Sequence, residues 1–276
     1  MPRPSFVTRH ASSRSTWAAE LTGPATIPTL SGVYNFRDLG GLPTTDGRRT
    51  VTGAIFRSDA LEELTGDDVR VLCDVIGVGR VIDLRAHVET GGGVPAWAAD
   101  ETVDFVSLPL SDDWDDWGVL DDEGRRTLMA RKYMSYLTAA SKNVVTSLEL
   151  IAENAGSRPT VFHCAVGKDR SGVVAAILLS LLGVTRDAIV ADYIATAANM
   201  EPIMRRLKRS AVYADRVRTN PAEVYRADDH TMRLFLDALD DRFGGAEPWA
   251  LDNGLDGAAL AHLREHLVET RDKEEQ

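Results

Sequence analysis

A cysteine and an arginine six positions apart are the residues of this chain best suited to chemistry. They are Cys164 and Arg170 in the segment HCAVGKDRSG (163–172), between an apolar segment typical of a strand and one typical of a buried helix. A strand–loop–helix junction directs several backbone N–H groups, and the positive end of the helix, toward one point. That cradle suits a tetrahedral dianion, and the same donors stabilise a thiolate at its floor. We therefore interpret Cys164 as a nucleophile and Arg170 as a side chain that grips two oxygens of the anion.

The spacing of this segment resembles the signature of the cysteine-dependent protein tyrosine and dual-specificity phosphatases. Further segments narrow the resemblance to the bacterial tyrosine phosphatases of the actinobacterial PtpB type, and the similarity runs from about residue 30 to residue 268. The order and spacing of several separate motifs make the resemblance specific. The additional segments read NFRDLGG (35–41), FRS (56–58), VIDLR (81–85) and ADY (191–193).

The resemblance implies a role for each matching residue. Cys164 would form a phosphocysteine, and Arg170 would bind the phosphoryl group most tightly in the transition state. Ser171 would assist the departure of the thiolate, and His163 would help to order the loop. The resemblance implies neither a metal nor a cofactor. The backbone amides expected to hold the phosphoryl oxygens are those of Ala165, Val166, Gly167, Lys168, Asp169 and Arg170.

The general acid, which would protonate the leaving phenolate and then activate water, has three candidates. Asp83, Asp112 and Asp169 all lie where ligands of an α/β sheet collect, at or just after the carboxyl ends of predicted strands. Asp112 has the position of the acid in dual-specificity phosphatases, but it stands in a run of acids typical of a solvated loop. Asp83 and Asp169 belong to motifs of the resemblance and rank ahead of it. The alternative for Asp83 is a structural ion pair with Arg85 or Arg57.

Strands and helices alternate along the chain, which predicts an α/β fold with a mainly parallel central sheet flanked by helices. Helical additions enlarge this tyrosine-phosphatase-like core. The predicted strands are one that ends at 54–56 and others at 80–85, 103–110 and 159–163. The predicted helices are 66–76 behind the N-cap Thr65, 127–154 with a break near 139–141, 173–182, and most of 186–269.

We expect a single phosphatase domain over residues 27–270. Residues 1–26, which are rich in Ser, Thr, Arg and Pro, are predicted to form a disordered arm, and 271–276 a frayed tail. A basic amphipathic stretch within 195–225 is either a solvated helix or part of a helical lid over the site. The lid follows from the resemblance alone.

The net charge of −11 over 276 residues argues against a nucleic acid as partner, because such a partner requires a basic face. It is compatible with a small anion, since local donors can outweigh the field of the whole protein. No apolar run approaches the roughly 20 residues that cross a bilayer. The two cysteines, Cys73 and Cys164, are typical of a reducing compartment, so we expect a cytoplasmic location, with export that uses no classical signal peptide as the alternative. His262 and His266 share a helix face, but no metal is expected there.

The predicted substrate is phosphotyrosine in a protein or peptide. We interpret Lys168 as an extra cation on the rim of the cradle. This feature resembles phosphatases that accept phosphoinositides. Phosphoinositides, phosphoserine and phosphothreonine are therefore secondary candidates. Two other interpretations stay open, a catalytically inactive phosphate-binding module and a rhodanese-like sulfurtransferase, although the loop of the latter is shorter. Arg37 and Arg57 are candidates for the rim of the pocket, and the oligomeric state is not indicated.

Overall fold

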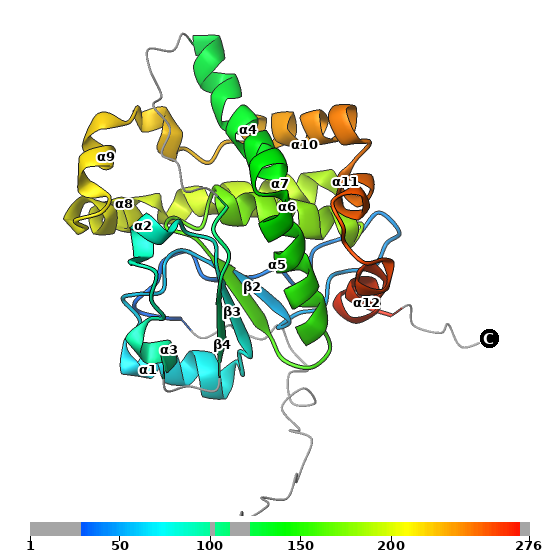
Figure 1. Cartoon of the computed structure of the whole chain (residues 1–276), viewed down its shortest axis with the longest axis horizontal. Helices are drawn as coiled ribbons and strands as arrows, with labels where there is room; N and C mark the ends of the chain where they lie inside the picture. The colour runs from blue at the N-terminus through cyan, green and yellow to red at the C-terminus, as the bar shows by residue number, and fades with distance from the viewer. Residues whose placement is uncertain (1–28, 100–102, 111–121, 271–276) are drawn as a thin grey trace, which may run out of the picture.

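A five-stranded sheet forms the centre of the molecule (Figure 1). The computed structural model describes residues 29–99, 103–110 and 122–270. The strand order is β1-β2-β5-β3-β4, in which β1 is antiparallel to β2 and all other neighbours are parallel. The predicted α/β fold with a mainly parallel sheet is therefore confirmed. The strands are β1 (Arg37–Asp38), β2 (Ile55–Ser58), β3 (Arg80–Asp83), β4 (Asp104–Ser107) and β5 (Thr160–His163).

The register of the three central strands brings their carboxyl ends together. Ser58 of β2 and Asp83 of β3 both lie opposite His163, the last residue of β5. Loops that follow parallel strands leave the sheet at the same edge, where ligands of such folds bind. The chain after β2, after β3 and after β5 therefore starts from one place.

Successive residues of the strands pack into two different cores, because side chains alternate between the faces of a sheet. Ile82 and Phe162 belong to the larger core, and Val81 and Val161 belong to the smaller one. Burial on both faces explains why the two central residues of β3 and of β5 are all apolar. The larger core lies under α4 (Asp122–Ala139), α5 (Ser141–Asn154) and α6 (Arg170–Leu181), and the smaller under the π-helical turn η2 (Val71–Val75) and α3 (Ala96–Ala99).

The chain after α6 is helical, as the sequence predicted. Two of its helices, α8 and α9, lie beside α2 at one side of the molecule (Figure 1). These helices and α2 contribute residues to the site, in addition to the loops that follow the strands of the sheet. Their bounds and those of the remaining helices are α2 (His87–Thr90), α7 (Arg186–Ala195), η3 (Thr196–Asn199), α8 (Met200–Arg209), α9 (Ala214–Thr219), η4 (Ala222–Tyr225), α10 (Asp229–Phe243), α11 (Ala246–Asp252) and α12 (Gly257–Leu267).

Several predicted boundaries are confirmed, and others shift for a local reason. Thr65 is an N-cap, and its hydroxyl accepts the N–H of Asp68 in a capping box. The predicted helix 66–76 is α1 (Gly66–Arg70), which continues into η2. The break between α4 and α5 lies where it was predicted, at residue 140. Helix α6 begins three residues earlier than predicted, because the end of the loop already has a helical hydrogen bond from Val173 N–H to the Asp169 carbonyl.

The predictions for residues 1–26, for Asp112 and for the tail 271–276 lie outside the described residues. Within the described part of the chain, no helix is both long enough and apolar enough to cross a membrane.

Candidate active site

The loop that carries Cys164 begins where β5 ends, in the middle of the sheet. Cys164 is 1% exposed at the floor of this loop. Gly167 has a positive φ of 72°, and a Cβ atom there would lie 2.6 Å from the carbonyl oxygen of Ser58. Both facts require glycine, because other residues avoid this backbone conformation and cannot approach the neighbouring chain so closely.

Two side chains hold the loop from behind by binding its carbonyl groups. Asn35 Nδ2 donates to the carbonyls of Val166 and Gly167 at 3.1 Å each, and Arg57 NH2 donates to the Gly167 carbonyl at 2.7 Å and to the Lys168 carbonyl at 3.3 Å. In a trans peptide the N–H points opposite to the C=O. The amides that follow these three carbonyls are therefore turned away from Asn35 and Arg57, as an anion cradle requires.

An ion-pair cluster fixes Arg57 in this position. Arg57 NH1 lies 2.5 Å from Asp192 Oδ2, and Arg37 Nε lies 2.6 Å from Asp192 Oδ1. Burial alone would raise the pKa of Asp192, but the two guanidinium groups outweigh burial and lower it. Arg57 is fully buried, so it supports the loop from the rear and does not line the rim that the sequence suggested. Arg37 acts on the same side through Asp192 and Asn35.

Ser171 lies next to the sulfur of Cys164. Its Oγ is 3.6 Å from Sγ, and it is buried in the first turn of α6. Arg57 NH2 lies 3.4 Å from the same Oγ. The hydroxyl is thus placed to donate a hydrogen bond to a thiolate.

Arg170 is held by a carboxylate that the sequence analysis did not identify. Its NH2 lies 2.9 Å from Glu89 Oε1, and its NH1 contacts Glu89 Oε2. Glu89 belongs to α2, where Oε2 also accepts the N–H of Ala86 at 2.7 Å. Burial lowers the pKa of Arg170, but the bonded Glu89 raises it well above its usual value. The guanidinium is therefore a permanent cation in a fixed orientation.

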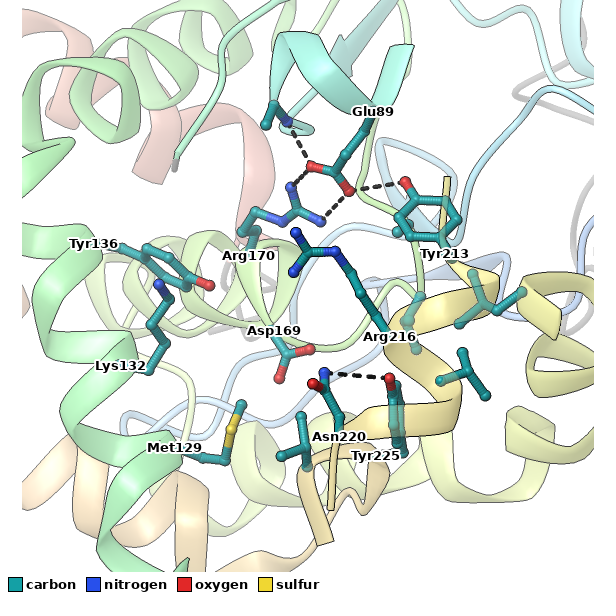
Figure 2. A pocket seen from close by; sticks show the side chains of 16 residues that line it. Glu89, Met129, Lys132, Tyr136, Asp169, Arg170, Tyr213, Arg216, Asn220 and Tyr225 are labelled. Atoms are coloured by element: carbon teal, nitrogen blue, oxygen red, sulfur yellow. Dashed lines mark hydrogen bonds and ion pairs between the residues drawn. The ribbon is translucent and has the colours of Figure 1, made fainter. Parts of the chain in front are cut away.

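A cavity of about 130 Å³ lies against the loop, and Arg170 and Asp169 both face it (Figure 2). Arg216 reaches from α9 toward Arg170, while Lys132 and Tyr136 stand on α4 at the other side. Most of the remaining wall is the segment from α8 to η4, which therefore covers one side of the cavity. The lining residues of that segment are Leu207, Tyr213, Arg216, Val217, Asn220, Val224 and Tyr225.

A sequence model described as the tyrosine phosphatase family matches residues 28–269, nearly the whole chain. The chain belongs to this family. The phosphatase is 30% identical over 213 residues to the triple specificity protein phosphatase PtpB of Mycobacterium tuberculosis, a match that covers 66% of this chain and 73% of that protein. It is 27% identical over 223 residues to a tyrosine-protein phosphatase of Nostoc commune, covering 78% and 74%. Among solved structures, the catalytic core of Siw14 gives a TM-score of 0.40 at 13% identity and covers 76% of this chain and 94% of its own. The family resemblance and the assignment as a phosphoric monoester hydrolase are confirmed.

The phosphatase places its two leading candidate acids differently. Asp169 lines the cavity, and its Oδ1 accepts the Tyr133 hydroxyl at 2.5 Å and lies 3.2 Å from Lys168 Nζ. Asp83 is 2% exposed and does not line the cavity; its two oxygens accept hydrogen bonds from Arg85 at 2.6–3.1 Å. The ion pair with Arg85 that the sequence allowed is therefore present, and burial raises the pKa of Asp83 to about 7.

Lys168 is not on the rim of the cradle. Its side chain is 1% exposed, and Nζ donates to the carbonyls of Val224 at 2.5 Å and Arg226 at 3.0 Å. An ammonium group this deeply buried requires such acceptors. Lys168 thus attaches the end of η4 to the loop.

The roles of Glu89, Tyr133 and Asn35 were not predicted from the sequence. Glu89 had one sequence signal, an acid three residues after Ala86 at the start of a short helix that follows the third motif. The roles of Tyr133 and Asn35 depend on contacts between residues 36 and 131 positions apart.

One group of side chains in the described residues has the spacing of a metal site. It consists of His262, Glu265 and His266 on α12, and none of the three lines the cavity.

Proposed function

We propose that this phosphatase hydrolyses phosphotyrosine in proteins or peptides through a phosphocysteine on Cys164. The observation that carries the proposal is the loop itself. A buried cysteine stands at its floor, its carbonyls are bound from behind, and Arg170 is fixed at the cavity. Two terminal nitrogens of Arg170 each use one hydrogen on Glu89, so three of the five N–H donors remain for a phosphoryl group.

In the first step the Cys164 thiolate attacks phosphorus, and the S–P bond forms as the bond to the phenolic oxygen breaks. The loop amides and Arg170 bind the equatorial oxygens, and their charge stabilisation is largest in the transition state. In the second step water attacks phosphorus and the electron pair of the S–P bond returns to sulfur. The Ser171 hydroxyl, 3.6 Å from Sγ, donates to the departing thiolate.

Asp169 is proposed as the general acid and base. It faces the cavity with 23% of its side chain exposed, whereas Asp83 is occupied by Arg85. Tyr133 and Lys168 both approach Oδ1 of Asp169, which orients the group and assigns the transferred proton to Oδ2. Asp169 would give this proton to the phenolate oxygen and take one from the attacking water.

The walls of the cavity favour an aromatic substrate. Met129, Leu207 and Val217 supply apolar surface in the cavity beside the loop of Cys164, which would hold a phenyl ring better than a short serine side chain. The relative from M. tuberculosis is named a triple specificity protein phosphatase, so more than one substrate class is to be tested. Phosphoserine, phosphothreonine and phosphoinositides stay the secondary candidates that the sequence suggested. The phosphoinositide hypothesis was based on Lys168 as a rim cation. Because Lys168 is buried and binds the carbonyls of Val224 and Arg226, that basis is lost. We also propose that residues 27–270 act as one domain in which the helical segment within 195–225 serves as a lid.

The test is turnover of p-nitrophenyl phosphate and of phosphotyrosine, phosphoserine, phosphothreonine and phosphoinositide substrates in EDTA, with and without vanadate. We expect vanadate-sensitive turnover that is fastest on phosphotyrosine. Cys164→Ser should abolish turnover and the phosphoenzyme that rapid denaturation traps in the wild type, but retain anion binding. A serine variant with wild-type rates would refute the mechanism. Vanadate binding without turnover would indicate an inactive module, and cyanide-dependent consumption of thiosulfate a sulfurtransferase.

A further inference from the structure

Tyr213 connects the helical segment over the cavity to the carboxylate that holds Arg170. It stands in the turn between α8 and α9, and its hydroxyl donates to Glu89 Oε1 at 2.8 Å. The same oxygen accepts Arg170 NH2 at 2.9 Å (Figure 2). One carboxylate oxygen therefore joins the segment to the phosphate-binding side chain.

Glu89 depends on this donor because its carboxylate is almost completely buried. Its side chain is 1% exposed, and its oxygens accept hydrogen bonds from Arg170, the Ala86 N–H and Tyr213. A buried carboxylate is stabilised only when its oxygens accept hydrogen bonds. Ala86 fixes the helix side of Glu89, whereas Tyr213 fixes the oxygen that faces Arg170 NH2. Without the hydroxyl, Oε1 would keep, among the described residues, only its bond from Arg170 NH2, and the Glu89–Arg170 pair would lose its bond to the helical segment.

We propose that Tyr213 is a positioning residue for Arg170 and acts through Glu89. The inference rests on the proposed function, since it assigns Arg170 to the phosphoryl group. The hydroxyl holds Glu89 in the orientation that points the remaining N–H donors of Arg170 into the cavity. It also takes up part of the negative charge of Glu89, which otherwise competes with the substrate for the same guanidinium.

Tyr213 can perform this role over the whole working pH range. Burial and the charge of Glu89 raise the pKa of Tyr213 above that of free tyrosine. The charges of Arg85 and Arg170 act in the opposite direction but do not reverse the shift, so the hydroxyl is a donor at neutral pH. Loss of the contact should change the rate at every pH rather than shift a limb of the pH profile.

A second contact ties the same helical segment to the loop at its other end. Lys168, two residues before Arg170, binds the carbonyls of Val224 and Arg226. The chain from Tyr213 to Arg226 is thus attached at both ends to groups that neighbour Arg170. The position of this segment and the position of the Arg170 guanidinium therefore depend on each other.

The test compares Tyr213→Phe, which removes the hydroxyl and keeps the ring, with Tyr34→Phe, which removes a hydroxyl from a tyrosine that does not line the cavity. Both tyrosines pack against the same small buried cluster beside the loop. We expect Tyr213→Phe to lower kcat about tenfold, as for a lost hydrogen bond to a charged group, with little change in KM. The affinity for vanadate, a transition-state mimic, should fall by the same factor, and the melting temperature should stay within a few degrees. An equal loss of kcat in Tyr34→Phe would overturn the proposal.

A double-variant comparison tests the route through Glu89. In a Glu89→Gln background, Tyr213→Phe should cause little further loss, because the group through which it acts is already changed. Independent, multiplicative losses would refute the route. Equilibrium vanadate binding to the Cys164→Ser protein, with and without Tyr213→Phe, separates this inference from the proposed function. Absence of catalysis would refute the function alone, whereas unchanged vanadate affinity in the Tyr213 variant would refute the positioning role.

Discussion

The two sides of the phosphate loop are built differently. Behind the loop, Asn35, Arg57 and Asp192 are buried and bind backbone carbonyls or one another. In front, Asp169 and Arg170 are partly exposed and face a cavity. The rear side chains fix the shape of the backbone, and those in front are the ones that we propose to meet the substrate.

From this difference we expect that substitutions can change the turnover of the enzyme and the stability of its fold separately. Changes at the front should reduce turnover and leave the fold intact. Changes at the rear should reduce both, because the cradle exists only while its carbonyls are held. Four variants test this separation, in order of decreasing effect.

Arg170→Lys is expected to have the largest effect on turnover. Lysine keeps the positive charge beside Glu89 but lacks the planar fork that binds two phosphoryl oxygens. We expect kcat/KM to fall about 10³-fold or more, within the range known for guanidinium groups in phosphoryl transfer, while the melting temperature changes little. Steady-state kinetics and thermal unfolding measure both quantities. If Arg170→Lys lowered the melting temperature together with kcat/KM, Arg170 would belong with the side chains that stabilise the loop from the rear.

Arg57→Met should destabilise the protein as well as inactivate it. The substitution removes a hydrogen-bond partner from both Asp192 and the Gly167 carbonyl. Breaking a buried ion pair lowers the free energy of unfolding by about 3–5 kcal/mol. Urea unfolding gives the value. Adding Asp192→Asn should recover part of the stability, since the unpaired charge is gone. If Arg57→Met were as stable as the wild type, the distinction between front and rear would fail.

Asp169→Asn should lower kcat about 10²–10⁴-fold without loss of stability, as expected for a general acid. The effect should be larger for phenyl phosphate than for p-nitrophenyl phosphate, whose leaving group needs no proton. Asp83→Asn provides the matched comparison, because Asp83 pairs with Arg85 and does not reach the cavity. It should lower stability and show no dependence on the leaving group. The opposite pattern would assign the acid to Asp83.

His163→Gln should change the pH dependence of stability rather than the rate. Burial and the charge of Arg85 lower the pKa of His163 well below its usual value, whereas the unfolded chain titrates near about 6.5. The unfolded state therefore binds more protons at acid pH, so stability is complete above about pH 6.5 and falls as the pH drops. His163 contributes up to about 1.4 kcal/mol per pH unit below that point.

Urea unfolding of His163→Gln and wild type between pH 5 and 8 measures this contribution as a difference in slope. Asp83 contributes the opposite slope, because its pKa is raised to about 7 and its stability contribution is lost as the pH rises. Because His163 Nε2 lies 3.8 Å from Asp83 Oδ2, Asp83→Asn and the double variant His163→Gln/Asp83→Asn are measured as well, and the difference within the Asp83→Asn background gives the contribution of His163. Parallel curves for the two proteins would contradict the prediction.

The parts of the fold and site that follow from the sequence are those set by nearby residues. The apolar strand before Cys164, the helix after it and the six-position spacing to Arg170 are local, and they predicted the sheet and the loop. Thr65 was recognised as an N-cap for the same reason, since its partner is three residues away.

The parts that could not be predicted depend on residues far apart in the chain. Glu89 meets Arg170 across 81 positions, and Tyr213 meets Glu89 across 124. The prediction for Lys168 was wrong because its acceptors, the carbonyls of Val224 and Arg226, come 56 and 58 residues later. A cation next to a nucleophile indicates the rim only when no buried carbonyl lies within its reach.

The contact between Arg57 and Asp192 also affects the stage of synthesis at which the protein can become active. These residues are 135 positions apart, and between them lie the nucleophile and the whole loop. A nascent chain that has not yet released residue 192 from the ribosome has the complete cysteine segment but no counter-charge for Arg57. Reactivity of the cysteine would then appear only after most of the polypeptide has been synthesised and docked. Phosphatase activity would report completed folding, and fragments that end before residue 192 would be inactive without any change to the loop.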